Sequence, residues 1–252
     1  MSMDVKGKAA IVTGSTKGIG KGIAKALAKA GANIVVVSRH QDDCDKVAME
    51  LKKAYGISTL AIAADITKTE KINELVQKTV EVFGKIDILV NNAGSALTKR
   101  AEDLTEEDWD SVVNLDLKAV FFCAQAVGKQ MIIQKYGKII NISSILGIVA
   151  DKQVLPYAVS KGGVLQMTKA LALEWAKHNI QVNAICPGYI VTEMNREDLS
   201  NAKISSHLLK KIVMRRFGQV EEISDAAIFL ASEGSNYMTG QHIVIDGGWC
   251  AE

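Results

Sequence analysis

Two residues one helical turn apart carry the clearest chemical signal in this chain. Tyr157 and Lys161 stand in the stretch PYAVSKGG, directly behind Pro156. Proline suits the first position of a helix, so the two side chains are expected on one face, with β-carbons about 5–6 Å apart. A phenol, with an ordinary pKa near 10, is a poor base at neutral pH, and a nearby ammonium stabilises its phenolate. The pair suits the transfer of a hydroxyl proton, although a half-buried phenol beside a solvated amine is also common on amphipathic helices.

The elements that would position this pair follow from an alternation of short apolar runs and longer amphipathic segments. Such alternation predicts an α/β fold: a single doubly wound Rossmann-type domain over 1–252, with a parallel sheet covered by helices on both faces. Ligands of such a sheet bind at the carboxyl ends of the strands. Gly31, Gly84 and Gly137 are expected where helices end. The seven predicted strands are 9–14, 33–38, 59–64, 87–92, 138–143, 181–186 and 242–247.

Composition excludes several classes of function. The chain has 252 residues, a formal net charge of +2 and 48% hydrophobic residues. We therefore expect no nucleic-acid partner and, without an apolar run near roughly 18 residues, no membrane span. The start of the chain does not resemble a signal peptide. The four cysteines, Cys44, Cys123, Cys186 and Cys250, are scattered and the four histidines show no ligand spacing, which predicts a cytoplasmic protein without a metal site.

A glycine-rich turn follows the first predicted strand. Gly14, Gly18 and Gly20 are spaced G-x-x-x-G-x-G in VTGSTKGIGKGIAKAL, with Lys17 and Ile19 between them. Glycine permits a close backbone approach, and the helix that follows presents free N–H groups to a pyrophosphate. Tight turns also use glycine for steric reasons alone, but the strand–turn–helix context favours a dinucleotide site.

The end of the second strand bears on which dinucleotide binds. An acidic residue there would grip the adenosine ribose and favour NAD(H), whereas this chain has Ser38 and Arg39. Together with Lys17 they suit a 2′-phosphate, so NADP(H) is favoured over NAD(H). The alternative is that Arg39 is merely solvated and that Asp42 or Asp43 caps the next helix.

Four motifs in this order indicate a family: TGSTKGIG, NNAG at 91–94, Tyr157-x-x-x-Lys161, and Pro187-Gly188. Over essentially its whole length the chain resembles the short-chain dehydrogenase/reductase family. The stretch HNIQVNAICPGYIVTEM is similar to gluconate and ketogluconate dehydrogenases. The resemblance implies hydride transfer between a secondary alcohol and a ketone, with Tyr157 as acid–base, Lys161 at the nicotinamide ribose and Ser144 at the substrate oxygen.

The same resemblance implies further cofactor contacts after the third, fourth and sixth strands. Each of these positions alone could equally reflect loop structure, and Asp65 could instead cap a helix. The expected contacts are Asp65 and Ile66 near the adenine, Asn92 and Gly94 near the adenosine ribose, and Pro187, Gly188, Ile190 and Thr192 near the nicotinamide.

One position departs from the family pattern. The family places a catalytic asparagine seven residues after the tryptophan that corresponds to Trp109, and this chain has Asp116 there. In the family this residue interrupts the helix, and its backbone carbonyl holds a water of the proton relay. The carbonyl survives the replacement, but an ionised carboxylate would oppose the phenolate. We expect a functional enzyme whose pH optimum falls in Asp116→Asn.

The substrate is less well defined. Residues 194–218 form a longer, basic insertion, which predicts a helical lid for an anionic sugar acid or carrier-bound acyl group, or else a plain surface helix pair. Gln153 and Tyr189 are expected to flank the substrate. The runner-up activity is 3-ketoacyl-carrier reduction, and a non-enzymatic NADP(H) sensor or a scaffolding subunit remains open. The resemblance also implies a homotetramer. The six basic residues of the insertion are Arg196, Lys203, Lys210, Lys211, Arg215 and Arg216, against Glu197 and Asp198.

Overall fold

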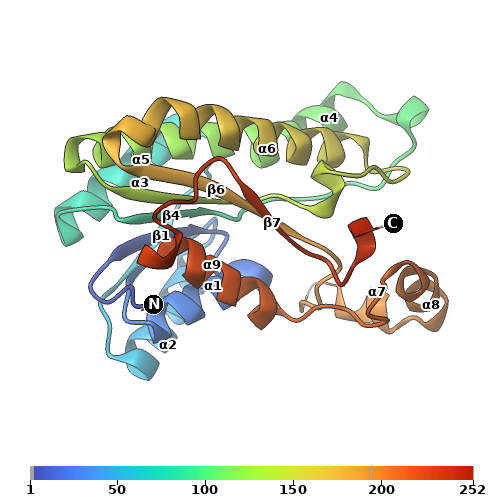
Figure 1. Cartoon of the computed structure of the whole chain (residues 1–252), viewed down its shortest axis with the longest axis horizontal. Helices are drawn as coiled ribbons and strands as arrows, with labels where there is room; N and C mark the ends of the chain where they lie inside the picture. Colours follow the sequence, from blue (N-terminus) through green and yellow to red (C-terminus); the bar gives the residue numbers. More distant parts are fainter. Residues whose placement is uncertain (1–2, 194, 252) are drawn as a thin grey trace.

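One parallel sheet runs through the protein (Figure 1). The computed structural model describes residues 3–193 and 195–251, and the side chains of residues 197, 198 and 202–204 lie outside that description. All seven predicted strands form, in the order β3-β2-β1-β4-β5-β6-β7. Their bounds are β1 Ala9–Thr13, β2 Asn33–Ser38, β3 Thr59–Ala63, β4 Ile88–Asn91, β5 Gly137–Ile142, β6 Ile180–Pro187 and β7 His242–Ile245.

The strand order reverses between β1 and β4, which are neighbours in the sheet although two strands separate them in sequence. The chain leaves β1 toward one face of the sheet and leaves β4 toward the other (Figure 1). Such a switch point opens a crevice at the carboxyl ends of the strands. The glycine turn after β1 and the NNAG stretch after β4 meet there.

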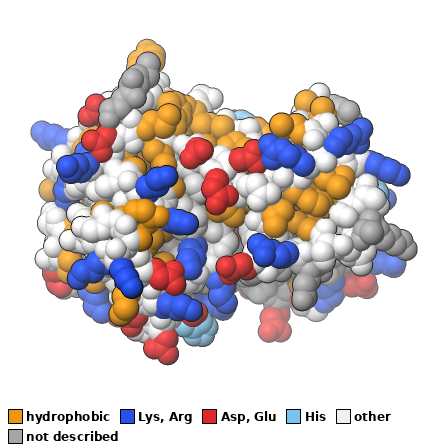
Figure 2. Space-filling model, turned by 90° about the horizontal axis from the view of Figure 1, so that it is seen from below, with side chains coloured by type: hydrophobic (Ala, Val, Ile, Leu, Met, Phe, Trp, Pro, Cys, Tyr) orange, Lys and Arg blue, Asp and Glu red, His pale blue; other side chains and the backbone are white. Residues whose placement is uncertain are grey.

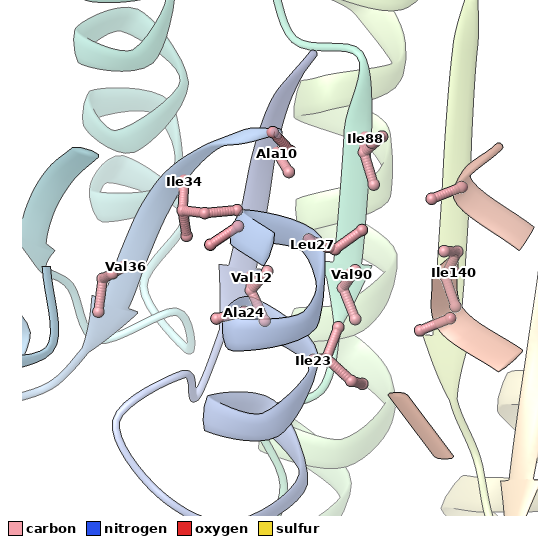
Figure 3. Packing of buried hydrophobic residues seen from close by; sticks show 14 of the residues in the cluster. Ala10, Val12, Ile23, Ala24, Leu27, Ile34, Val36, Ile88, Val90 and Ile140 are labelled. Carbon is pink, nitrogen blue, oxygen red and sulfur yellow. The ribbon is translucent and has the colours of Figure 1, made fainter. Parts of the chain in front are cut away.

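Helices cover both faces (Figure 1), and the central strands β1, β4, β5 and β6 are buried because each face packs against apolar helix surfaces. In Figure 3, Ile23, Ala24 and Leu27 lie against Val12 and Val90 of the sheet. This packing fixes the first helix, and hence its N-terminus, beside the end of β1. One face carries α1 Gly18–Lys29, α2 Gln41–Tyr55 and α9 Val220–Ala231; the other carries α3 Thr69–Phe83, α4 Glu106–Val113, α5 Ala119–Gln134 and α6 Leu155–Trp175.

The helix ends agree with the sequence at two of the three glycines. Gly84 caps α3 with a φ of 72°, and Gly31 follows α1 with a φ of 91°. The prediction for Gly137 is wrong, because Lys135 takes the left-handed conformation after α5 with a φ of 55°. Gly137 is instead the first residue of β5, where a β-carbon would collide with the sulfur of Met131.

A π-helical turn, Asn114–Lys118, joins α4 to α5, so the helical run continues from 106 to 134. Within the described residues this run alone is long and apolar enough to cross a membrane, and 44% of its most apolar 18-residue stretch is buried inside the protein. The run packs against the sheet through buried apolar side chains, among them those of Ala124 and Val127.

The insertion between β6 and α9 is helical, as predicted. It contains α7 Arg196–Ser200 and α8 Ala202–Lys211 and lies at the end of the molecule near the C-terminus (Figure 1). Basic and hydrophobic side chains lie side by side at this end (Figure 2), where the exposed residues include Val213 and Met214. Met194 lies outside the described residues.

Candidate active site

The glycine turn has the shape of a backbone cradle. Gly14 and Gly18 have φ values of 65° and 52°, and Gly20 sits where a β-carbon would collide with the Asn92 amide and the Gly14 carbonyl. Helix α1 begins at Gly18, and no side chain caps it. The N–H groups of its first turn therefore have no side-chain partner, which fits a bound pyrophosphate.

The ends of β1 and β4 are joined by side-chain hydrogen bonds. The Asn92 amide donates to the carbonyls of Thr13 and Gly14, at 2.9 and 3.2 Å. In return, the backbone N–H groups of Asn92 and Ala93 donate to the Thr13 hydroxyl. These bonds place the predicted ribose-contacting residues Asn92 and Gly94 directly beside the predicted phosphate turn.

The end of β2 lies beside the same turn, because Thr13 pairs with Val37 and the Ser15 N–H donates to the Val37 carbonyl. Ser38 donates to the carbonyl of His40 and accepts from its N–H, and Arg39 is exposed. Helix α2 starts at Gln41 with His40 as its N-cap, so neither Asp42 nor Asp43 is the cap. No acidic side chain occupies the β2 end, and Arg39 is available to a ligand.

Asp65 supports a turn rather than a helix end. Its Oδ1 accepts from the N–H and the hydroxyl of Thr67 at 3.0 and 2.7 Å, while α3 starts later, with Lys68 as its N-cap. The Thr67 hydrogen bond lowers the pKa of Asp65 below its ordinary value, and the positive charge of Arg39 adds a smaller contribution in the same direction. Ile66 is buried in the core.

Tyr157 and Lys161 share one face of α6, as predicted. The Lys161 Nζ lies 5.3 Å from the centre of the Tyr157 ring and donates to the Ile142 carbonyl at 3.1 Å. The lysine side chain is 4% exposed, whereas Tyr157 is partly open to solvent. An ammonium held this deep acts on its neighbours with little screening.

Ser144 stands at the end of β5, in a turn that packs against α6. Its hydroxyl accepts from the Leu146 N–H at 3.1 Å, and the neighbouring Ser143 donates to the carbonyl of Lys161 at 2.9 Å. Gly147 lets this turn approach closely, since a β-carbon there would lie 2.7 Å from that carbonyl. The structure thus brings Ser144 to the part of α6 that carries Lys161.

Asp116 lies inside the π-helical turn and is fully buried. Its Oδ1 accepts from the Ser95 N–H at 2.8 Å, and its Oδ2 lies 3.1 Å from the Lys161 Nζ. Burial raises the pKa of Asp116 above its ordinary value, while the positive Lys161 and the Ser95 N–H act in the opposite direction. The structure therefore places Asp116 in direct contact with the predicted catalytic lysine.

The Pro187-Gly188 motif closes the far side of the crevice. The Gly188 N–H donates to the Ile245 carbonyl at 2.8 Å, and a β-carbon on Gly188 would lie 2.7 Å from the Cα of Asp246. Thr192 reaches across to the glycine turn, with its methyl group 3.5 Å from the position of a β-carbon on Gly18. Ile190 is 4% exposed and packs in the core.

Comparisons with known proteins agree with this geometry. The family model described as enoyl-(acyl carrier protein) reductase matches residues 14–250. A 2-dehydro-3-deoxy-D-gluconate 5-dehydrogenase of Dickeya dadantii is 41% identical over 99% of this chain and 98% of its own. An NAD-dependent glycerol dehydrogenase of Listeria innocua is 40% identical over 98% and 95%. The chain belongs to the short-chain dehydrogenase/reductase family.

Solved structures of this family superimpose closely. A gluconate 5-dehydrogenase from Burkholderia cenocepacia, crystallised with NADP and tartrate, has a TM-score of 0.95 and 36% identity, covering 99% of this chain and 98% of the other. The turn fits a dinucleotide such as the NADP of that crystal structure, because it leaves backbone N–H groups uncapped and a β-carbon on Gly14 or Gly20 would meet neighbouring atoms at 3.0 Å or less. Among residues 3–193 and 195–251, no group of three His, Cys, Asp or Glu is placed to bind a metal ion.

The predicted substrate residues are less tightly grouped. Burial raises the pKa of Tyr189 above its ordinary value, and the charges of Asp151 and Tyr157 contribute further in the same direction. The Tyr189 ring also packs against Trp249, with centres 5.0 Å apart. Gln153 has an exposed side chain and a φ of 64°.

Three of the five basic residues of the insertion whose side chains the structure describes already have partners within the protein. Those partners make these three residues structural supports of the insertion as much as candidates for binding an anion. Arg215 donates to the carbonyls of Leu209 and Lys210, Arg216 forms hydrogen bonds of 2.7 and 2.8 Å with Glu222, and the Lys211 Nζ lies 5.2 Å from the centre of the Trp249 ring. Arg196 and Lys210 are exposed, and the side chains of Lys203, Glu197 and Asp198 lie outside the described residues.

Several supporting residues were not predicted from the sequence. Ser95 binds Asp116, Asn195 accepts from the N–H and the hydroxyl of Thr192, and Trp249 packs on Tyr189. Ser95 directly follows the NNAG motif, so its position offered a signal. The contacts of Asn195 and Trp249 depend on turns that no short motif specifies.

Proposed function

We propose that this chain is an NADP(H)-dependent oxidoreductase that interconverts a secondary alcohol and a ketone on a sugar, sugar acid or polyol. The observation that carries the proposal is the placement of Tyr157 and the buried Lys161 on one face of α6, beside the Ser144 turn. A proton-transfer group, a fixed positive charge and a hydroxyl meet at the carboxyl edge of the sheet. The uncapped glycine cradle lies at the same edge.

Tyr157 is the acid–base group in this scheme. In alcohol oxidation its phenolate takes the hydroxyl proton, and in ketone reduction its phenol returns a proton to the carbonyl oxygen. Ser144 orients the substrate oxygen by hydrogen bonding, and the Lys161 ammonium stabilises the phenolate electrostatically. The nicotinamide cofactor, when bound, accepts or supplies the hydride.

NADP(H) is the favoured cofactor because a basic, rather than an acidic, side chain follows β2. Arg39 is exposed there, beside the cradle, and a guanidinium binds a 2′-phosphate through two parallel hydrogen bonds. The gluconate 5-dehydrogenase from Burkholderia cenocepacia was crystallised with NADP, which supports this choice. The Listeria innocua relative is named as NAD-dependent, so both cofactors belong in the test.

The substrate class rests on the named relatives and on the lid. Two relatives are named for sugar acids and one for glycerol, all of which carry secondary alcohols. We propose that the chain forms a single domain. Residues 194–218, which include α7 and α8, would form a lid over its crevice. The exposed Arg196 and Lys210 would favour an anionic substrate.

We also propose a cytoplasmic homotetramer. Helices α5 and α6 are largely apolar, yet Ile133 and Leu173 are 77% and 84% exposed on their outer faces. Such residues suit burial between copies of the chain. The four cysteines are free thiols, which suits a reducing compartment.

A substrate panel tests the proposed activity. The purified protein would be mixed with NADPH or NADH and with a ketogluconate, a simple ketose, an acetoacetyl thioester or a bulky hydrophobic ketone. Absorbance of the reduced nicotinamide reports turnover, and Tyr157→Phe serves as the matched inactive variant. We expect fastest oxidation of NADPH with the sugar-acid ketone.

Other outcomes identify the alternatives. A preference for the acetoacetyl thioester would assign the chain to 3-ketoacyl-carrier reduction instead. No turnover with any ketone, combined with tight NADPH binding, would contradict the enzymatic proposal and favour a cofactor sensor.

A further inference from the structure

We propose that Asp116 and Lys161 act as one buried, electrically neutral pair, in which Asp116 is a positioning residue that holds the lysine and moves proton transfer at Tyr157 to higher pH. The proposal deepens the oxidoreductase function and rests on it for its kinetic consequences. It concerns what this chain does with an aspartate where its family has an asparagine.

The π-helical turn is what brings the carboxylate inward. Between Asn114 and Lys118, Asp116 is the buried residue, with an exposed fraction of 0%. The extra residue of a π-turn rotates one side chain relative to a regular helix, and such turns recur at functional sites. The carboxylate faces α6 and the loop after β4, the two elements that supply its polar contacts.

Space for the carboxylate depends on a neighbouring glycine. A β-carbon on Gly94 would lie 2.7 Å from the Asp116 Oδ2, the oxygen that contacts Lys161. Gly94 therefore has a role besides its predicted contact with the cofactor. It lets the chain after β4 pass against the carboxylate while Ser95 donates its N–H to Oδ1.

The lysine is held by two protein oxygens. Its Nζ lies 3.1 Å from the Asp116 Oδ2 and donates to the Ile142 carbonyl at 3.1 Å. Only the contact with the Ile142 carbonyl has hydrogen-bond geometry, so the contact with Asp116 is an ion pair, and two of the three N–H donors of the ammonium remain for a ligand or a water among the described contacts. The Ile142 carbonyl and the negative charge of Asp116 together fix where the ammonium sits before any ligand arrives, which is the positioning that the proposal assigns to Asp116.

The charge of the pair has a second consequence. The groups that face the carboxylate are Lys161 and, beyond it, Tyr157 from α6, and the Ser95 N–H from the loop after β4. A lysine alone would stabilise the Tyr157 phenolate with a full positive charge, whereas the pair presents a dipole. Phenolate formation then requires a higher pH, which favours Tyr157 as the proton donor of ketone reduction.

The isosteric variant Asp116→Asn separates the charge from the shape. Its amide oxygen can still accept from Ser95, but the negative charge beside Lys161 is gone. We expect the pH profile of kcat for alcohol oxidation to move down by about one pH unit, the size expected for one charge removed at several ångströms in a protein interior. Asp87→Asn is the matched control, because Asp87 is also buried and contacts lysines, Lys85 and Lys8, at the opposite end of β4.

A readout without turnover keeps this proposal separate from the proposed function. Ultraviolet absorbance of tyrosinate would be titrated in the cofactor-free protein and in Asp116→Asn, each against its own Tyr157→Phe counterpart, so that the difference reports Tyr157 alone. We expect phenolate to form about one pH unit lower in Asp116→Asn, with circular dichroism showing an intact fold. An unchanged titration of Tyr157 in folded Asp116→Asn, or an equal shift of that titration in Asp87→Asn, would contradict the proposed role of the Asp116–Lys161 pair. A wild-type protein without turnover would count against the enzymatic function only, since the titration does not depend on it.

Discussion

The side-chain amide of Asn92 occupies the space beside the Cα of Gly20, where a β-carbon would collide with it. The same amide donates to the Thr13 and Gly14 carbonyls, so the end of β4 holds the glycine turn in place through two hydrogen bonds. Gly20→Ala should therefore displace either the Asn92 amide or the Gly14 carbonyl. We expect a loss of about 1–3 kcal/mol in unfolding free energy, as for other overpacked sites, and at least about tenfold weaker NADPH binding.

Gly84→Ala is the matched control for that substitution. Gly84 has a φ of 72°, but no atom lies within 4 Å of the place that a β-carbon would take, so only its backbone conformation resists alanine. We expect a stability loss of about 1 kcal/mol and unchanged NADPH affinity. Equal losses of affinity in both variants would show that binding merely follows stability.

Arg39 should distinguish the two nicotinamide cofactors. We expect Arg39→Ala to weaken NADPH binding by about 10- to 100-fold, the usual range for a lost hydrogen bond to a charged group. NADH, which lacks the 2′-phosphate, should bind as before. Fluorescence titration with each cofactor measures the difference, and Lys53→Ala, a change at another exposed cation, serves as the control. An unchanged dissociation constant for NADPH in Arg39→Ala would contradict the assignment.

Tyr157→Phe removes a hydroxyl and little else. If the phenol transfers the proton, kcat should fall by about 10²- to 10⁴-fold, while NADPH binding stays within about threefold because the ring and Lys161 remain. Steady-state kinetics and cofactor titration measure the two quantities separately. Tyr237→Phe is the control, since that ring is fully exposed. Full activity in Tyr157→Phe would remove Tyr157 from the mechanism.

Much of the fold could be predicted because its signals are local. Each strand is a short, mostly apolar run, and Gly84 ends its helix for the conformational reason that the sequence suggests. Gly137 shows where local reasoning fails. Its lack of a side chain serves a contact with Met131, and Lys135 accepts the strained conformation in its place.

The candidate site likewise has features that local sequence signals predict and contacts that they do not. The i and i+4 spacing of Tyr157 and Lys161 predicts a shared face, and the structure confirms it. The departure at Asp116 was visible in the sequence, but its contact with Lys161 was not, because the contact depends on how the π-helical turn packs against α6 across 45 residues of chain. The pairing of Arg216 with Glu222 likewise leaves fewer cations between β6 and α9 for an anion than a count of charges in the sequence suggests.

Lys138 carries a prediction about stability, far from the site. It lies on β5 with an exposed fraction of 1%, and its ammonium donates to Ser235 and Asn236 at 3.2 and 2.8 Å. Burial, with a smaller contribution from the positive Lys8, lowers the pKa of Lys138 from 10.5 to about 8. Between pH 8 and 10.5 the unfolded chain therefore binds more protons at this residue than the folded protein does. The free energy of unfolding should then rise with pH, by up to roughly 3 kcal/mol from this residue.

Lys138→Met isolates that contribution, because methionine has a similar length and no proton to lose. Urea unfolding of both proteins across the same pH range should show that the free energy of unfolding of the wild type rises, relative to that of the variant, as the pH rises. Lys177→Met, at an exposed lysine, corrects for the general effect of removing a positive charge. If the difference between wild type and Lys138→Met stays constant from pH 8 to 10.5, the ammonium is as well accommodated in the folded protein as in water, and burial does not lower its pKa.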